Sequence, residues 1–189
     1  MHPALQTFLN GKISLSPEHE ELVSRCFKQK ITKRNEILVP QGTTAKHVYF
    51  VVKGCLRVFL TRANGSESTR FLIFEGRMGT AFPSFILRQP SSATVQSLEP
   101  SELLLISYED RHMLQKVVPG WETMDRIGLE RDYIESIQRI ESFITMDAAT
   151  RYALLLQTNP DMVLRLPSKI VADYLGISQE TLSRLKGKH

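Results

Sequence analysis

Several features that mark specialised proteins are scarce or absent in this chain of 189 residues. It has two cysteines, Cys26 and Cys55, without CxxC spacing, and its five histidines are scattered along the sequence. A disulfide framework, a zinc site or an iron-sulfur site is therefore not indicated, and no cofactor or metal is expected. We expect both cysteines to be buried, reduced thiols.

Long apolar stretches are also missing. No run approaches the eighteen or more apolar residues of a membrane span, and the N-terminus, residues 1–6, lacks the basic-then-apolar layout of a signal peptide. The composition, 42% hydrophobic and 23% charged, is typical of a soluble protein that can bury a core in one or two domains. We therefore expect a cytoplasmic protein.

The charge is unevenly distributed. The net charge is only +4, but residues 120–160 hold four basic against seven acidic residues, a balance of −3. Residues 162–189 hold five basic against two acidic residues, a balance of +3. A local positive excess favours contact with a phosphate backbone, so the end of the chain is the candidate nucleic-acid-binding region.

The last two dozen residues predict two short helices joined by a tight turn. Ile170, Val171 and Leu175 form an apolar stripe at helical spacing. Gly176 can adopt the left-handed conformation that ends a helix, and Ser178 is a natural N-cap for the next. The pattern is typical of a helix-turn-helix, although a plain helical hairpin with a hydrated polar face fits it too.

The second of these helices has polar side chains that can read base edges in a major groove, with Arg bidentate to guanine and Glu accepting from cytosine. Lysines at both ends of the motif are candidate phosphate ligands. The candidate DNA-binding residues are Gln179, Glu180, Ser183, Arg184, Lys186, Lys188 and Lys169.

Residues 1–30 look helical, with Ser16 and Pro17 as a helix start. From Ile37 to Ser107 the pattern changes to short β-rich runs separated by turns, including the hairpin signal Asn64-Gly65. The expected strands are 47–52, 56–61, 70–74, 93–98 and 103–107. Gly42, Gly54, Gly65 and Gly76 follow one another at 12, 11 and 11 residues, and such regular spacing predicts an antiparallel barrel or jelly roll.

After Pro119-Gly120 a helical pattern continues without a break to about Thr145. Its apolar face is broad, so we expect it to pack on its own β domain and on a second copy; burial against its own sheet alone is the alternative. The candidate dimer-interface residues are Ile127, Tyr133, Ile134, Ile137, Ile140 and Ile144. Asp147 then caps a further helix that ends at 159–161, and 162–166 is expected to be extended.

This order of parts resembles the Crp/Fnr family of bacterial transcription regulators over nearly the whole chain. The closest similarities are residues 42–54, which are similar to the family's first β-roll segment, and 177–185, which are similar to its recognition helix. The resemblance implies an α+β fold: an N-terminal antiparallel β-roll or jelly-roll sensor domain with flanking helices (1–118), a dimerisation helix (119–145) and a small all-α helix-turn-helix domain (146–189). It also implies a homodimer that binds a palindromic operator in double-stranded DNA and a small effector.

The sequence departs from the family at the effector pocket. Cyclic-nucleotide-binding members hold the ribose with a Glu and the cyclic phosphate with an Arg. This chain has Gly79, Thr80 and Ala81, then Ser91 and Ser92, at the matching places. A buried phosphate without its Arg loses several kcal/mol, on the order expected for an unpaired buried charge. We therefore expect a degenerate pocket, formed by these five residues, that does not bind cyclic AMP. The Fnr-type cysteine cluster and any haem motif are also absent.

A second departure is that the chain stops at His189, before the β-hairpin wing of the family, so we expect a truncated reader whose DNA binding is weak or depends on the dimer. The Glu-x-x-Ser-Arg order of Glu180, Ser183 and Arg184 resembles the Fnr branch, whose half-sites centre on a TTGA-like core. A DNA-binding regulator is the leading interpretation, and an effector-binding sensor or interaction module with weak or lost DNA binding is the alternative. A cupin-like enzyme is disfavoured because the histidines do not cluster.

Overall fold

The computed structural model describes residues 1–187, so the prediction for Lys188 lies outside the described residues. The chain divides into two compact units, one comprising Met1–Thr61 and Arg70–Gly128, the other Arg62–Thr69 and Leu129–His189. Among residues 1–187, no helix combines the length and the apolar character needed to cross a bilayer. The three-part division expected from the sequence stays a prediction.

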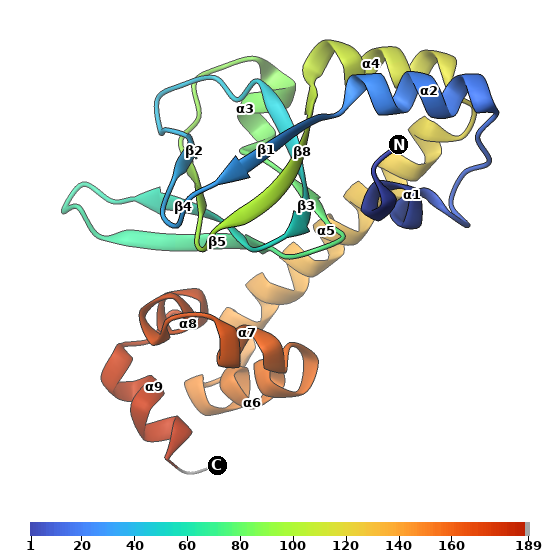
Figure 1. Ribbon diagram of the computed structural model, residues 1–189. Helices are drawn as coiled ribbons and strands as arrows, with labels where there is room; N and C mark the ends of the chain where they lie inside the picture. The colour runs from blue at the N-terminus through green and yellow to red at the C-terminus, as the bar shows by residue number, and fades with distance from the viewer. Residues whose placement is uncertain (188–189) are drawn as a thin grey trace. The chain divides into compact units, whose positions relative to one another are not determined.

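Two four-stranded antiparallel sheets form the centre of the first unit (Figure 1). One has the order β1-β8-β3-β6, with the strands Lys28–Thr32 (β1), Ser101–Ser107 (β8), His47–Lys53 (β3) and Met78–Gly79 (β6). The other has the order β2-β7-β4-β5, with the strands Ile37–Val39 (β2), Thr94–Ser97 (β7), Leu56–Thr61 (β4) and Glu67–Ile73 (β5). The α+β class and the antiparallel β-roll are confirmed.

Four helices flank these sheets: Pro3–Leu9 (α1), Pro17–Cys26 (α2), Phe82–Leu87 (α3) and Tyr108–Val117 (α4). The expected start of α2 is confirmed, because the Ser16 side chain accepts a hydrogen bond from the His19 amide at 3.2 Å and Pro17 occupies the first turn. Helix α2 packs on α4. The prediction of helix up to residue 30 is wrong, because β1 begins at Lys28 and pairs, as the edge strand, with β8 far along the chain.

Glycine is required at the turn between β3 and β4. Gly54 has φ of 109°, and a Cβ there would overlap the side chain of Ser101. The same strands enclose a core whose largest fully buried side chains include Phe50, Phe85 and Leu103. The conformational freedom of Gly54 therefore allows the turn, and burial of apolar side chains stabilises the sheets.

A buried ion pair joins α4 to the start of the long helix α5, Trp121–Thr145. The Arg111 Nη2 and Asp125 Oδ2 atoms lie 3.2 Å apart, and Gln115 donates a second hydrogen bond to Asp125 at 2.9 Å. Desolvation raises the pKa of Asp125, and the charge of Arg111 only partly offsets this. The pair therefore fixes the first turns of α5 more than it stabilises the fold.

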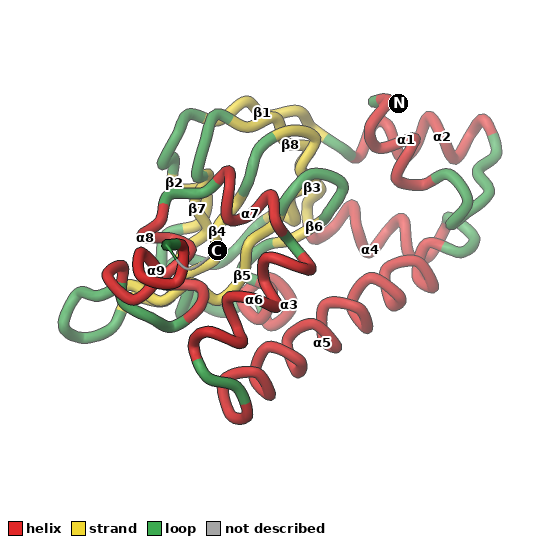
Figure 2. Tube along the Cα trace, turned by 90° about the horizontal axis from the view of Figure 1, so that it is seen from below, coloured by secondary structure: helices red, strands yellow, loops and turns green. Residues whose placement is uncertain are grey.

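Four short helices follow α5 in the second unit (Figure 2): Ala148–Thr158 (α6), Pro160–Arg165 (α7), Ser168–Leu175 (α8) and Gln179–Lys186 (α9). The predicted caps are confirmed: Asp147 accepts from the Thr150 amide at 2.8 Å, and Ser178 accepts from the Thr181 amide at 3.1 Å. Gly176 ends α8 with φ of 67°, as expected.

The extended run predicted for 162–166 is wrong, because residues to Arg165 belong to helix α7. Pro160 suits the first turn of a helix, and Pro167 forces Leu166 out of the helical region, so the helix is confined to six residues. Met162, Val163 and Leu166 are buried and Leu164 is exposed, which fits the spacing of a helix. In so short a segment the same pattern cannot be told from that of a strand.

Two arginines hold the C-terminus of α8. Arg139 of α5 donates to the carbonyl of Tyr174 at 2.8 Å, and Arg151 of α6 donates to the carbonyl of Leu175 at 3.2 Å. Both guanidinium groups also lie over the ring of Phe143. The last carbonyls of a helix carry partial negative charge, so these cations both satisfy and stabilise the end of α8.

Candidate nucleic-acid interface and effector cavity

Helix α9 packs against the rest of the second unit with one face, and its other face is exposed to solvent. Leu182 is fully buried and Leu185 half-buried, whereas Gln179, Glu180 and Ser183 are exposed. Since α8 and α9 flank a left-handed glycine turn, the two helices pack on each other through their apolar faces. The structure therefore presents a polar helical face on a rigid support.

The acidic and basic members of this face are poised for opposite hydrogen-bonding roles. A hydrogen bond from the Ser178 side chain is the largest of the effects that lower the pKa of Glu180, and the charge of Arg184 contributes to a lesser extent. Glu180 is thus an ionised group that can only accept hydrogen bonds. Arg184 is exposed, and its Nη2 donates to Thr181 Oγ1 at 3.2 Å, which leaves the rest of its donor fork directed elsewhere.

Two of the predicted phosphate ligands lie close together. The Lys186 Nζ donates to the Ser168 side chain at 3.1 Å, and the exposed Lys169 is the next residue in α8. The start of α8 and the end of α9 therefore bring two positive charges to one edge of the polar face. Positive charges gathered in this way favour contact with a phosphate backbone.

The predicted dimer residues are all exposed on α5. Relative exposure is 56% for Ile127, 68% for Tyr133, 54% for Ile134, 36% for Ile137, 53% for Ile140 and 76% for Ile144. Leu129 and Phe143 are exposed on the same helix, and Phe143 was missed by the sequence prediction, while Met124 is buried in the first unit. Contiguous exposed apolar side chains of this size mark an interaction surface.

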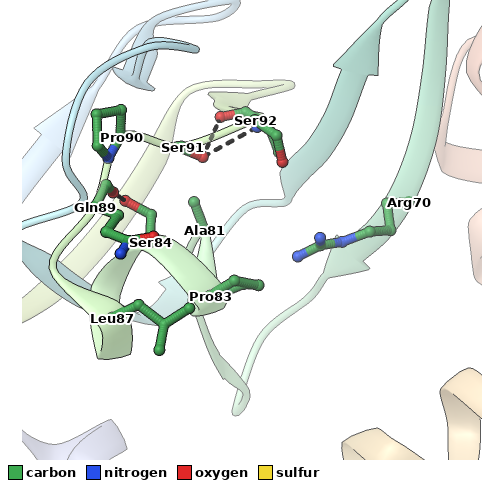
Figure 3. Close-up of a pocket in the computed structure, with 10 residues that line it drawn as sticks. Arg70, Ala81, Pro83, Ser84, Leu87, Gln89, Pro90, Ser91 and Ser92 are labelled. Carbon is green, nitrogen blue, oxygen red and sulfur yellow. Dashed lines mark hydrogen bonds between the residues drawn. The ribbon is translucent and has the colours of Figure 1, made fainter.

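The first unit contains a cavity of about 100 Å³ beside α3 (Figure 3). Of the residues predicted for an effector pocket, Ala81, Ser91 and Ser92 line it. The other lining residues are Arg70, Pro83, Ser84, Leu87, Gln89, Pro90 and Ala93. The volume is well below the roughly 300–1,000 Å³ of typical ligand pockets.

The other two predicted pocket residues have structural contacts. Thr80 is buried, and its hydroxyl donates to the carbonyl of His47 at 2.8 Å. Gly79 belongs to β6 and pairs with Tyr49, and a Cβ on Gly79 would overlap Ile73. Neither residue is among those that line the cavity.

Arg70 is the lining residue that the sequence interpretation missed. It extends from β5 toward Ala81 and the loop that carries Ser91 (Figure 3). Burial lowers the pKa of its guanidinium, which still stays protonated because arginine does not lose its proton in proteins. The available signal was a charged residue at the start of the expected strand 70–74, whose other four members are apolar or aromatic.

Within residues 1–187, no group of three or more His, Cys, Asp or Glu side chains is arranged to hold a metal ion. Cys26 and Cys55 are both buried free thiols, as expected.

Known proteins are similar to this chain in sequence. The model of the cyclic nucleotide-binding domain matches residues 29–116. The cAMP-activated global transcriptional regulator CRP of Escherichia coli is 24% identical over 185 residues, which cover 93% of this chain and 88% of the relative. Residues 29–116 thus match a cyclic nucleotide-binding domain, and nearly the whole chain is similar to CRP.

Solved structures share the Crp/Fnr fold. FixK2 from Bradyrhizobium japonicum matches with a TM-score of 0.75 and 15% identity, covering 86% of this chain and 83% of that one. A transcriptional regulator of the Crp/Fnr family from Eubacterium rectale matches with a TM-score of 0.71 and 17% identity, covering 97% of this chain and 84% of that one. The Escherichia coli and Eubacterium rectale proteins are transcription regulators, which agrees with the sequence interpretation.

Proposed function

We propose that this protein is a dimeric, DNA-binding transcription regulator of the Crp/Fnr family whose second unit reads an operator through α9. The observation that carries the proposal is the exposed polar face of α9, with Glu180, Ser183 and Arg184 at i, i+3 and i+4. That spacing places the three side chains on one side of the helix, where a major groove can receive them.

The chemistry of this face supports base-specific contacts. Arg184 presents a donor fork that matches O6 and N7 of guanine, and the ionised Glu180 accepts from N4 of cytosine on the opposite strand. Lys169 and Lys186 supply charge for the phosphates along one side of the groove. Specificity therefore comes from two residues, and much of the affinity from charges beside them.

A second copy of the chain is the proposed cover for the apolar face of α5. Tyr133, Ile137, Ile140 and Ile144 follow one another at 4, 3 and 4 residues, which is the spacing of a coiled-coil seam. Two α5 helices packed in this way would give a two-fold dimer, and the two reading helices would then bind a palindromic operator.

We propose that cyclic AMP is not an effector of this protein. The hydroxyl of Thr80 is engaged with the carbonyl of His47, so it cannot replace the family's ribose-binding Glu. Ser91 occupies the position of the phosphate-binding Arg, and its hydroxyl donates to the carbonyl of Ala93 at 2.7 Å. A cavity of about 100 Å³ is also small for a nucleotide.

Selection from a pool of random duplexes, followed by a gel shift, tests the DNA-binding role. We expect one enriched, palindromic sequence whose affinity exceeds that of a scrambled duplex by about 10³-fold or more. Equal binding to all duplexes, or none, contradicts the proposal and favours a sensor or interaction module without effective DNA binding.

Thermal melting with millimolar cyclic AMP tests the effector assignment separately. A ligand at about 100 times its Kd stabilises a protein by roughly 2.7 kcal/mol, which shifts the melting temperature by several degrees. We expect no shift. A clear shift means that the interpretation of Thr80 and Ser91 is wrong.

A further inference from the structure

The hydroxyl group of Thr181 connects the start of α9 to the arginine that is proposed to read bases. Its Oγ1 atom lies 3.2 Å from the Oγ atom of Ser178, and Arg184 Nη2 donates to the same Oγ1 atom at 3.2 Å. The amide of Thr181 donates to Ser178 Oγ at 3.1 Å, which is the N-cap bond of the helix. A single side chain therefore links the exposed guanidinium of Arg184 to the capped first turn of α9.

Thr181 lies at the margin of the polar face of α9. It is half-buried and precedes the fully buried Leu182, whereas Arg184 is exposed. Residues three apart in a helix are neighbours on its surface, so Thr181 supports Arg184 from the preceding turn. A β-branched side chain has few rotamers in a helix, and its hydroxyl is therefore a well-placed acceptor.

The hydrogen bond to Thr181 restricts the guanidinium of Arg184 without consuming its donors. The Nη2 atom carries two hydrogens, and the bond to Thr181 uses one of them. The other remains available with the N–H groups of Nη1 and Nε for O6 and N7 of guanine. A long, exposed side chain loses rotamer freedom when it binds, and ordering it beforehand reduces that loss.

We propose that Thr181 is a positioning residue for base readout, whose hydroxyl holds the guanidinium of Arg184 in place before DNA binds. The inference rests on the proposed DNA-binding function and adds a residue that was not among the DNA-binding residues predicted from the sequence. A threonine hydroxyl can also donate directly to a DNA phosphate, but such a contact carries no sequence information. Positioning of Arg184 acts only where a guanine is read, so the specificity ratio separates the two roles.

The experiment compares substitutions of Thr181 in the full chain. Thr181→Val removes the hydroxyl, and it keeps both the β-branched shape and a similar helix propensity. Thr181→Ser keeps the hydroxyl. Gel shifts at one salt concentration give the Kd on the selected operator and on a scrambled duplex. Thr181→Val should weaken operator binding about 3- to 10-fold, the cost of ordering one flexible side chain, and leave the scrambled duplex unchanged. Thr181→Ser should bind both duplexes like the parent.

Two further variants guard against a trivial loss of structure. Thr181→Ala removes the hydroxyl and favours the helix, so it should give the same loss as Thr181→Val. Thr158→Val makes the valine change at an exposed threonine of α6, whose hydroxyl donates to the carbonyl of Leu154 at 2.8 Å. It should leave both Kd values unchanged. Thermal unfolding followed by circular dichroism confirms that each variant is folded.

A double-mutant cycle tests whether Thr181 acts through Arg184. In the Arg184→Ala background, Thr181→Val should cause no further loss on the operator, because there is no guanidinium left to position. An equal loss in both backgrounds, or equal weakening of both duplexes, means that the hydroxyl acts without Arg184 and would overturn the proposal. Operator binding that is unchanged in Thr181→Val and Thr181→Ala would overturn it too.

Failure of this inference can be distinguished from failure of the proposed function. An operator that Arg184→Ala weakens but Thr181→Val and Thr181→Ala do not removes the positioning role alone, and the DNA-binding role stands. Selection of no operator by the parent chain refutes both.

Discussion

The two compact units dispose of their apolar side chains in different ways. In the first unit the exposed large hydrophobic residues are scattered over several elements, among them Ile31, Leu87 and Val117. In the second unit seven of them fall on the single helix α5: Leu129, Tyr133, Ile134, Ile137, Ile140, Phe143 and Ile144. Scattered exposure is ordinary, but a continuous apolar face is an interface. The first unit therefore encloses a cavity, and the second carries the apolar face for which we propose a second copy of the chain as the partner.

The core of the first unit should give the largest stability effect. Phe85 of α3 is fully buried, so Phe85→Ala should lower the free energy of unfolding by about 3–5 kcal/mol. Urea unfolding followed by the fluorescence of Trp121, the single tryptophan, reports on this unit. Leu87→Ala, on the same helix but 63% exposed, is the control and should change stability by less than about 0.5 kcal/mol. Equal losses in both variants would mean that α3 does not close the core.

A charge placed on the apolar face of α5 should change the oligomeric state of the protein. Ile137→Glu places a charge in the proposed seam, at a cost of several kcal/mol on the order of an unpaired buried charge, and should convert the dimer to a monomer. Gln138→Glu adds the same charge at the neighbouring polar position and should leave the dimer intact. Light scattering measures both. A stable monomer for the parent chain, or a dimer that survives Ile137→Glu, contradicts the proposed interface.

Substitution of the glycine in the turn between α8 and α9 should lower the stability of the protein by an intermediate amount. Gly176 has φ of 67°, and a Cβ there would approach Phe143 Cε1 to 2.8 Å. Gly65 has a similar φ of 79° with open space around it. Gly65→Ala should therefore cost about 1–2 kcal/mol for its backbone alone, and Gly176→Ala more. Thermal unfolding followed by circular dichroism compares them, and equal losses would show that the Phe143 contact does not matter.

Substitution of the N-cap residue of α6 should have the smallest effect on stability, and this effect should depend on pH. Hydrogen bonds from Thr150 lower the pKa of Asp147, so this group stabilises the folded state above its unfolded pKa of about 3.8 and loses that effect as the pH falls through the lower folded value. Asp147→Asn keeps a capping side chain that does not titrate. Between about pH 5 and pH 3, the parent should lose slightly more thermal stability than the variant; identical pH profiles would exclude a charged cap.

Local patterns were enough to predict several parts of the fold. Ser178, Gly176 and Asp147 have the predicted cap and turn roles because capping depends on a few neighbouring residues. Strand β4 has the predicted bounds, Leu56–Thr61. By contrast β1 depends on β8, about seventy residues away in sequence, and the helical segment 160–165 was too short to tell from an extended run.

The candidate sites also differ in how far the sequence predicts them. The exposed face of α9 and the apolar face of α5 follow from helical periodicity, which the sequence shows directly. The cavity does not, because its lining combines β5, α3 and the loop before β7. Arg70 belongs to it through folding of the sheet, and no local motif relates residue 70 to residues 81 and 91.

Base readout by Arg184 is the central claim, and a comparison of two alanine variants tests it most directly. Gel shifts on the selected operator and on a scrambled duplex give the specificity ratio of the parent, of Arg184→Ala and of Lys186→Ala. We predict that Arg184→Ala loses about 1–3 kcal/mol on the operator alone, which lowers the ratio at least several-fold. Lys186→Ala should weaken both duplexes alike and reduce the salt dependence. Equal weakening of both duplexes by Arg184→Ala would contradict the account, because α9 would then hold DNA by charge without reading its bases.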